Sequence, residues 1–187
     1  MRVSKEQAAE NRARILAETA RMIREAGIAG VGVDALTKAA GLTHGSLYSQ
    51  FGSKERLVEE ALAQALAASA EKARQELASG GSLATIVARY LSPTHRDAPG
   101  SGCAIAAIGP EAGRQPAGVR RVFTRGVRSL AERLAGAMPA RTAETPEDAA
   151  LGVVATLVGA LILARAVDDP DLSDRILAAG ARQLLPE

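Results

Sequence analysis

Side chains that could read nucleic acid are concentrated between residues 43 and 49. Thr43, His44, Ser46, Tyr48 and Ser49 fall in this segment, and each can donate or accept a hydrogen bond. On a short helix these groups would be presented together, which suits hydrogen bonding to base edges and phosphate oxygens. The alternative for each of them is a solvated residue at a turn.

Capping and turn signals place these residues on the second of two short helices. Apolar residues at helical spacing predict a helix over residues 33–40, which Gly41 would end. Thr43 can cap the next helix, and Leu47 and Phe51 would turn its inner side toward the core. Two short helices joined by a tight turn that contains glycine are typical of a helix-turn-helix.

The rest of the chain predicts helices only. A first helix would end at Gly27, and a long fourth helix would start after Ser53 and run to about Leu77. The Pro- and Gly-rich segment 93–102 predicts a loop. The remaining helices are expected at residues 83–91, after Cys103, after Pro116, from Thr145 to about Ala164 and after Asp169. No stretch alternates like a strand for long, so the fold class is all-α with about nine helices.

The helix expected over residues 149–164 is apolar nearly all round. Such a helix must be buried on every side, and one lobe of this size can cover only part of it. Gly152, Ala155, Gly159 and Ala160 would let a second helix approach closely. We therefore expect a homodimer through the two C-terminal helices; the alternative is the central helix of a monomeric bundle.

Composition limits the class of protein. The 187 residues include 23 Lys and Arg against 21 Asp and Glu, a net charge of +2, so only a few placed cations could hold nucleic acid. Cys103 is the single cysteine, which excludes an intrachain disulfide and favours a reducing cytoplasm. Residues 1–7 lack the apolar stretch of a secretory signal, and the run 149–164 is shorter than the ~20 residues that span a bilayer. We expect a soluble, cytoplasmic protein.

Catalytic and metal-binding arrangements are not recognisable. The two histidines, His44 and His95, and the lone Cys103 have neither the spacing of a zinc cluster nor that of a Cys/His pair. His95 falls in the Pro- and Gly-rich segment, where solvent exposure is the simpler interpretation. We expect no enzyme activity, no metal and no cofactor.

Residues 40–51, AGLTHGSLYSQF, followed by residues 54–57, KERL, resemble the N-terminal signature of the TetR family of bacterial repressors. The length and the expected order of helices are similar to that family, as is the segment 102–107. The resemblance implies a helix-turn-helix DNA-binding domain at residues 1–52 and an effector-binding and dimerisation domain at residues 53–187. The third helix would enter the major groove of operator DNA.

Matching positions give the predicted DNA-binding residues, and Lys54, at the start of a helix, also suits a phosphate. The set consists of Thr43, His44, Gly45, Ser46, Tyr48, Ser49, Lys54 and Lys38. Lys38 is included for its charge and not for a matching position. Together with Thr37, Arg12 and Arg14 it could add phosphate contacts, although a charged helix face is more often simply solvated. The chain departs from the family at Gly32, where Ser or Thr usually caps the second helix and touches phosphate.

The resemblance also implies a small-molecule site in the C-terminal lobe. The candidate ligand-binding residues are Tyr90, Cys103, Phe123 and Thr156. Phe123 could instead belong to the core, Thr156 could satisfy its own helix backbone, and Cys103 could be a small buried residue or a reactive thiol. The composition, poor in aromatic residues, favours a small apolar effector.

Together these expectations describe a ligand-responsive, DNA-binding transcriptional regulator. It would be a homodimeric repressor that a small apolar molecule releases from its operator. The rival interpretation is a helical dimeric scaffold, or interaction protein, without DNA binding.

Overall fold

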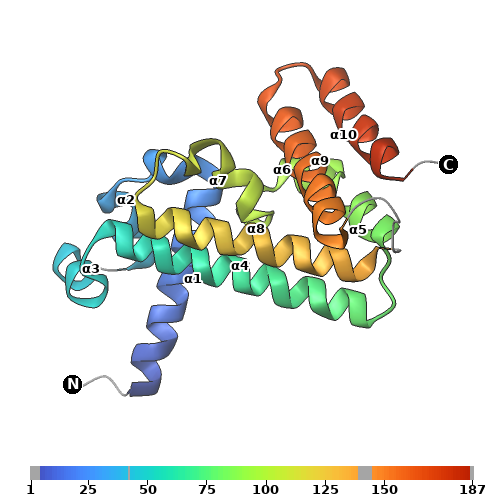
Figure 1. The fold of residues 1–187 in the computed structure, drawn as a ribbon. Helices are drawn as coiled ribbons and strands as arrows, with labels where there is room; N and C mark the ends of the chain where they lie inside the picture. Colours follow the sequence, from blue (N-terminus) through green and yellow to red (C-terminus); the bar gives the residue numbers. More distant parts are fainter. Residues whose placement is uncertain (1–4, 42, 139–144, 186–187) are drawn as a thin grey trace.

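The computed structural model describes residues 5–41, 43–138 and 145–185 as an all-α protein (Figure 1). The described residues form ten α-helices and one 3-10 segment and no strand, which confirms the predicted fold class. The elements are α1 (Lys5–Gly30), α2 (Val33–Ala40), α3 (His44–Phe51), α4 (Lys54–Ala78), α5 (Leu83–Tyr90), α6 (Pro93–Asp97), η1 (Pro99–Ser101), α7 (Ala104–Ala112), α8 (Ala117–Ala137), α9 (Pro146–Ala166) and α10 (Pro170–Leu184).

Side-chain caps start several helices where the sequence predicts them. Thr43 Oγ1 accepts from the amide of Ser46 at 3.1 Å, and Ser53 Oγ accepts from the amide of Arg56 at 3.2 Å. Thr145 and Asp169 cap α9 and α10 in the same way, each ahead of a proline in the first turn. These bonds satisfy amide groups that have no partner inside the helix.

Positive φ angles at Gly27 and Gly41 mark where helical segments end. Gly41 has φ 65° and ψ 34° after α2, the left-handed conformation of a helix C-terminus. Gly27 has φ 75° and ψ 164° and interrupts α1, so that residues 28–30 form a separate turn after a kink. The predicted end of the first helix at Gly27 is therefore the position of this kink.

The predicted loop over residues 93–102 is wrong. Ser92 Oγ accepts from the amide of His95 at 3.1 Å, and Pro93 follows at the first helical position, so α6 begins here and η1 comes after it. Proline and glycine in this segment start and end short helices. The sequence therefore predicted nine helices, one fewer than the ten α-helices of the described residues.

The helix α4 runs along the molecule and packs against α1 and α8, with α3 at one end and α5 toward the other (Figure 1). One core lies among α1, α2, α3, α7 and the near parts of α4 and α8, and includes Ile15, Leu36, Leu47, Leu62 and Ile108. A second core lies among α5, α9, α10 and the far part of α8. The three N-terminal helices thus share their core with α7, which comes from the other side of the predicted domain boundary at residues 52 and 53.

The helix α9 is longer than its apolar run because Thr145 caps it before Ala149. It is the one helix among the described residues that is long and apolar enough to cross a membrane, and 39% of its apolar window is buried inside the fold. That buried side packs against α8 and α10, as in a core helix. Its other side carries exposed Leu163, Leu151 and small residues.

Gly41 and Gly113 follow the ends of α2 and α7 and differ in the sign of φ, so they allow a matched test of stability. Gly41→Ala should lower the free energy of unfolding by about 1–2 kcal/mol, because an L residue is strained at φ 65° although the space around it is open. Gly113→Ala, at φ −62° and ψ −22° with equal space, should leave stability unchanged or raise it by up to about 1 kcal/mol. Urea titration measures both; equal losses would contradict the assigned conformations.

Candidate functional site

The helix α3 lies at one end of the molecule (Figure 1). One side of this helix is polar and exposed to solvent. Its inner side is fixed by Leu47, which is 0% exposed, and Phe51, which is 5% exposed. Its outer side carries Thr43, His44, Gly45, Tyr48 and Ser49, all exposed, with Ser46 half-buried between them. The structure therefore brings the predicted α3 residues onto one accessible surface.

The hydroxyl groups on this surface already have partners within the helix. Thr43 Oγ1 lies 2.9 Å from Ser46 Oγ in addition to accepting from the Ser46 amide, and Ser49 Oγ donates to the Ser46 carbonyl at 3.1 Å. A Cβ at Gly45 would meet nothing closer than 4.0 Å, so the space above it is open. Tyr48 is half exposed and presents its phenol beyond these groups.

His44 is oriented by the preceding helix. Its Nε2 lies 2.6 Å from Asp34 Oδ1, and both side chains are exposed. This pair connects the first residue of α3 to the first turn of α2. Any base contact by His44 would compete with the Asp34 carboxylate, an interaction that the sequence pattern gave no reason to expect.

The predicted cations differ in their surroundings. Lys54 Nζ donates to the carbonyl of Ile28 at 3.3 Å, while Lys38 is exposed on α2. The Arg12 guanidinium lies 4.2 Å from the centre of the Phe51 ring, donates to the Gln50 carbonyl at 3.2 Å and pairs with Glu60. Arg12 therefore holds the end of α3 against α1 and α4.

Two further details concern the expected phosphate contacts. Thr37 is buried, and its hydroxyl donates to the Asp34 carbonyl at 3.0 Å, so the side chain is turned away from solvent, where a phosphate would bind. Gly32 caps α2 without a side-chain bond, and a Cβ there would meet nothing within 4 Å. The missing hydroxyl is thus not a consequence of crowding.

Glu111 connects the C-terminal lobe to the helix-turn-helix region. Its carboxylate accepts from the amide of Ile28 at 2.6 Å and from that of Ala29 at 3.3 Å, just after the kink at Gly27. Amides at a helix interruption need such acceptors. The end of α7 is thereby fixed to the same turn of α1 that Lys54 contacts.

A cavity of about 490 Å³ lies in the C-terminal lobe between α4, α5, α8 and the segment that leads into α7. Tyr90 and Cys103 both line it. Phe123 and Thr156, also expected to bind the ligand, are not among the residues that line this cavity. Phe123 packs against the first core, and Thr156 Oγ1 donates to the Gly152 carbonyl within its own helix at 3.0 Å.

His95, expected in a solvated loop, is half-buried beside Tyr90 and Cys103. Its Nδ1 lies 2.7 Å from the Tyr90 carbonyl, and its Nε2 accepts from the Cys103 amide at 3.0 Å. These partners fix a neutral ring with its proton on Nδ1. The ring also packs edge-on against Tyr90, with centroids 4.7 Å apart.

Burial dominates the electrostatics of this cluster. It lowers the pKa of His95; the hydrogen bond to the Tyr90 carbonyl opposes the shift, and Arg165, Arg89 and Lys72 add to it. Burial also raises the pKa of Tyr90 well above its ordinary value, with a contribution from the nearby Cys103 side chain. Both groups are therefore neutral near pH 7.

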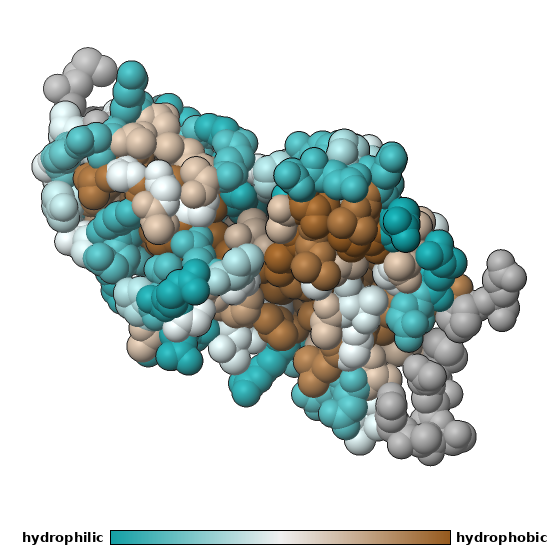
Figure 2. Space-filling model, turned by 90° about the horizontal axis from the view of Figure 1, so that it is seen from above, coloured by the Kyte–Doolittle hydropathy of each residue, from teal (hydrophilic) through white to brown (hydrophobic). Residues whose placement is uncertain are grey.

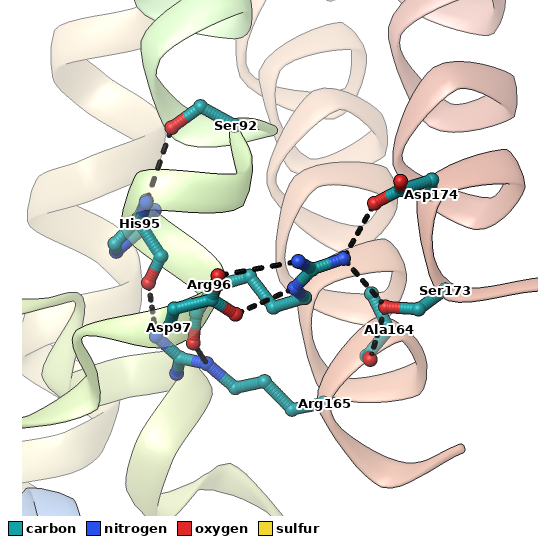
Figure 3. Close-up of polar contacts among 8 residues, drawn as sticks. All are labelled: Ser92, His95, Arg96, Asp97, Ala164, Arg165, Ser173 and Asp174. Atoms are coloured by element: carbon teal, nitrogen blue, oxygen red, sulfur yellow. Dashed lines mark hydrogen bonds and ion pairs between the residues drawn. The ribbon is translucent and has the colours of Figure 1, made fainter. Parts of the chain in front are cut away.

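Arginines attach α6 to the two C-terminal helices (Figure 3). Arg96 Nη1 lies 2.6 Å from Asp174 Oδ1 and 3.0 Å from Ser173 Oγ on α10. Arg165 on α9 donates to the carbonyls of His95 and Arg96, at 2.7 Å and 3.0 Å. One wall of the cavity is thus bonded to α9 and α10.

Metal binding has no candidate site in the described part of the chain. Nowhere in it do three or more His, Cys, Asp or Glu side chains come together in a way that could hold a metal ion.

Comparison with known proteins identifies relatives of the N-terminal region and of the fold. Residues 15–61 match the family described as bacterial regulatory proteins, tetR family. The reduced form of E. coli NemR is 23% identical, with a TM-score of 0.79 over 94% of this chain and 95% of that one. A TetR-family regulator from Cytophaga hutchinsonii is 22% identical, with a TM-score of 0.76 over 98% and 96%.

A TetR-family regulator from Agrobacterium tumefaciens is 19% identical, with a TM-score of 0.78 over 94% of this chain and 97% of that one. At these identities the similarity is one of fold. No curated protein matches the chain.

The buried, neutral His95 predicts a pH dependence of stability. The pKa of His95 is lowered in the folded protein, so below about pH 6.5 the unfolded chain binds a proton that the fold excludes. This contribution to the free energy of unfolding is complete above that pH and declines as the pH falls toward the folded pKa. Urea titrations at several pH values should show a shallower decline for His95→Gln; identical profiles would contradict the prediction.

Proposed function

Because residues 15–61 belong to the TetR family of bacterial regulators and the whole chain has the fold of solved TetR-family regulators, we propose that this DNA-binding regulator is a cytoplasmic, homodimeric repressor. A small, mostly apolar molecule releases it from its operator. The observation that carries the proposal is the polar outer side of α3, held outward by the burial of Leu47 and Phe51. Electrophoretic mobility shift on DNA flanking its gene is the direct test.

In this proposal α3 lies in the major groove and reads it from its first turn. Thr43 and His44 are nearest the base edges, while Tyr48 and Ser49 reach phosphates along one side of the groove. Lys54 and Lys38 add positive charge at the starts or sides of neighbouring helices. The Lys54 bond to Ile28 orients the ammonium group without neutralising it, because a carbonyl carries no net charge.

The dimer would form through the exposed side of α9 and α10. Figure 2 shows apolar side chains gathered over the half of the molecule that contains these helices. Leu163 is 56% exposed, and Leu151 and Leu172 are each 39% exposed. A Cβ at Gly152 or Gly159 would meet nothing within 4 Å, so a second helix can approach closely there. Large exposed apolar patches mark interaction surfaces.

Ligand release would follow from the position of α7. This helix starts at Cys103 beside the cavity and ends where Glu111 holds the kinked end of α1. A ligand that displaces the start of α7, or the adjoining part of α4, would change the angle of α3 to its partner in the dimer. For operator release it must bind the two arrangements unequally, with a coupling typically of about 1–3 kcal/mol.

The low net charge of +2 is the observation that favours the alternative, a helical dimeric scaffold without DNA binding. If the chain bound no DNA under any ligand condition, while remaining dimeric, the scaffold interpretation would replace the proposed one. Two specific variants test the proposal more closely.

Lys54→Ala should weaken binding to operator and to unrelated DNA alike, because a phosphate contact carries no sequence information. The slope of log affinity against log salt should fall by about 1. Lys72→Ala, which removes an exposed lysine several turns further along α4, is the matched control and should keep the wild-type slope. Fluorescence anisotropy at several salt concentrations measures both, and an unchanged slope in Lys54→Ala would remove this residue from the phosphate contacts.

Leu163→Glu should convert the dimer into a monomer, because it places a charge in the centre of an apolar interface. Light scattering after size exclusion measures the mass. Tyr48→Glu, also at a half-exposed position but on α3, should keep the dimer and lose DNA binding. A dimeric Leu163→Glu protein would place the interface elsewhere.

A further inference from the structure

We infer that the cavity of the C-terminal lobe binds an organic acid, with an apolar body along the cavity walls and a carboxylate on Arg133. The inference rests on the proposed function, since it names the chemical class of the molecule that would act on the regulator. It also changes the earlier expectation of an apolar effector, because it adds a carboxylate to the apolar body.

The charge of the cavity lining has one sign. Its described lining residues include Lys72, Arg89 and Arg133 and contain no Asp or Glu. Arg89 forms an ion pair with Glu76 at 2.8 Å, so its charge is already balanced. Lys72 is exposed. Arg133 is therefore the half-buried cation of the lining that forms no ion pair among the described residues, and the neighbouring Glu132 attracts it only from a longer distance.

The surroundings of Arg133 leave room for an anion. Its Nη1 donates to Ser129 Oγ at 2.5 Å, and its Nε is shielded from solvent and has no acceptor among the described residues. No carboxylate in the described part of the chain forms an ion pair with it within 4.0 Å. Burial lowers the pKa of Arg133, yet a guanidinium stays charged in proteins.

A partly buried guanidinium without an ion-pair partner lowers the stability of the fold. A bound carboxylate would remove this cost, because it accepts two parallel hydrogen bonds in the geometry that arginine prefers. Tyr90 adds a second donor. Its hydroxyl is buried without a hydrogen bond of normal geometry, and its raised pKa keeps it protonated. The polar groups of the cavity thus favour a ligand that carries oxygen acceptors.

The walls of the cavity fit the apolar body of such an acid. They are formed largely by Leu66, Leu77, Ile86, Ile105, Leu130 and Leu157. The volume of about 490 Å³ lies within the range of about 300–1,000 Å³ that small-molecule sites occupy. A neutral hydrocarbon would fill the same walls but would leave Arg133 and Tyr90 unpaired.

The test compares acids with alcohols of the same length by isothermal titration calorimetry. Octanoate, decanoate and dodecanoate form one series, and the corresponding primary alcohols form the other. For the wild-type dimer, at least one acid should bind about tenfold or more tightly than its alcohol, a difference of about 1.4 kcal/mol. Equal affinities within every pair, or no binding by any acid, would overturn the inference.

Substitutions on α8 test whether Arg133 causes the preference for the acid over the alcohol. Arg133→Gln should bind acid and alcohol equally, whereas Arg133→Lys should keep part of the preference because it keeps the charge. Arg128→Gln, at an exposed position on the same helix, is the matched control and should behave as wild type. Circular dichroism verifies that each variant is folded. A full preference for the acid in Arg133→Gln would exclude this residue as the anion's partner.

The calorimetric result is independent of operator binding. If the acid binds through Arg133 but leaves the operator complex intact in a mobility-shift assay, the inference stands and the proposed release mechanism fails. If a neutral molecule releases the operator while no acid binds, the proposed mechanism stands and the inference fails.

Discussion

The carboxylate of Glu111 is the polar contact that joins the end of α7 to the kink in α1, within the core that both helices share. It accepts hydrogen bonds from the amides of Ile28 and Ala29, where Gly27 interrupts α1. Backbone amides at such a break would otherwise lack protein partners, and leaving the partly buried amide of Ile28 unpaired would cost about 1–3 kcal/mol. Since Lys54 donates to the carbonyl of the same Ile28, the start of α4 meets this turn as well. Three helices are thus fixed at one kink.

This arrangement makes the helix-turn-helix region a part of a larger packed unit. Leu47 and Phe51 hold α3 in a core that also contains Ala104 and Ile108 from α7. The orientation of α3 is therefore set by packing that extends to the cavity, where α7 begins. A contiguous set of packed contacts of this kind is what can carry coupling between two sites.

Two half-buried arginines hold the short segment of α6 and η1. Arg24 on α1 donates to the Gly100 carbonyl at 2.7 Å, and Arg165 on α9 donates to the carbonyls of His95 and Arg96. Burial lowers the pKa of both side chains, and each finds carbonyl oxygens as acceptors. Arg133 differs, since its described partner is the single hydroxyl of Ser129. The chain thus uses arginine to anchor backbone at two places and places a third guanidinium in the lining of the cavity.

The sequence by itself determined the features that arise within one helical turn. Thr43, Ser53, Thr145 and Asp169 cap helices because a cap and its amide lie three residues apart, and Gly41 ends α2 because only glycine adopts its φ without strain. The outward position of Tyr48 follows from the same periodicity. Only the tertiary structure decided which distant residues meet. His95 is half-buried against Cys103, His44 pairs with Asp34, and Phe123 and Thr156 do not line the cavity. Such contacts depend on how whole helices cross, and no local pattern of spacing records that geometry.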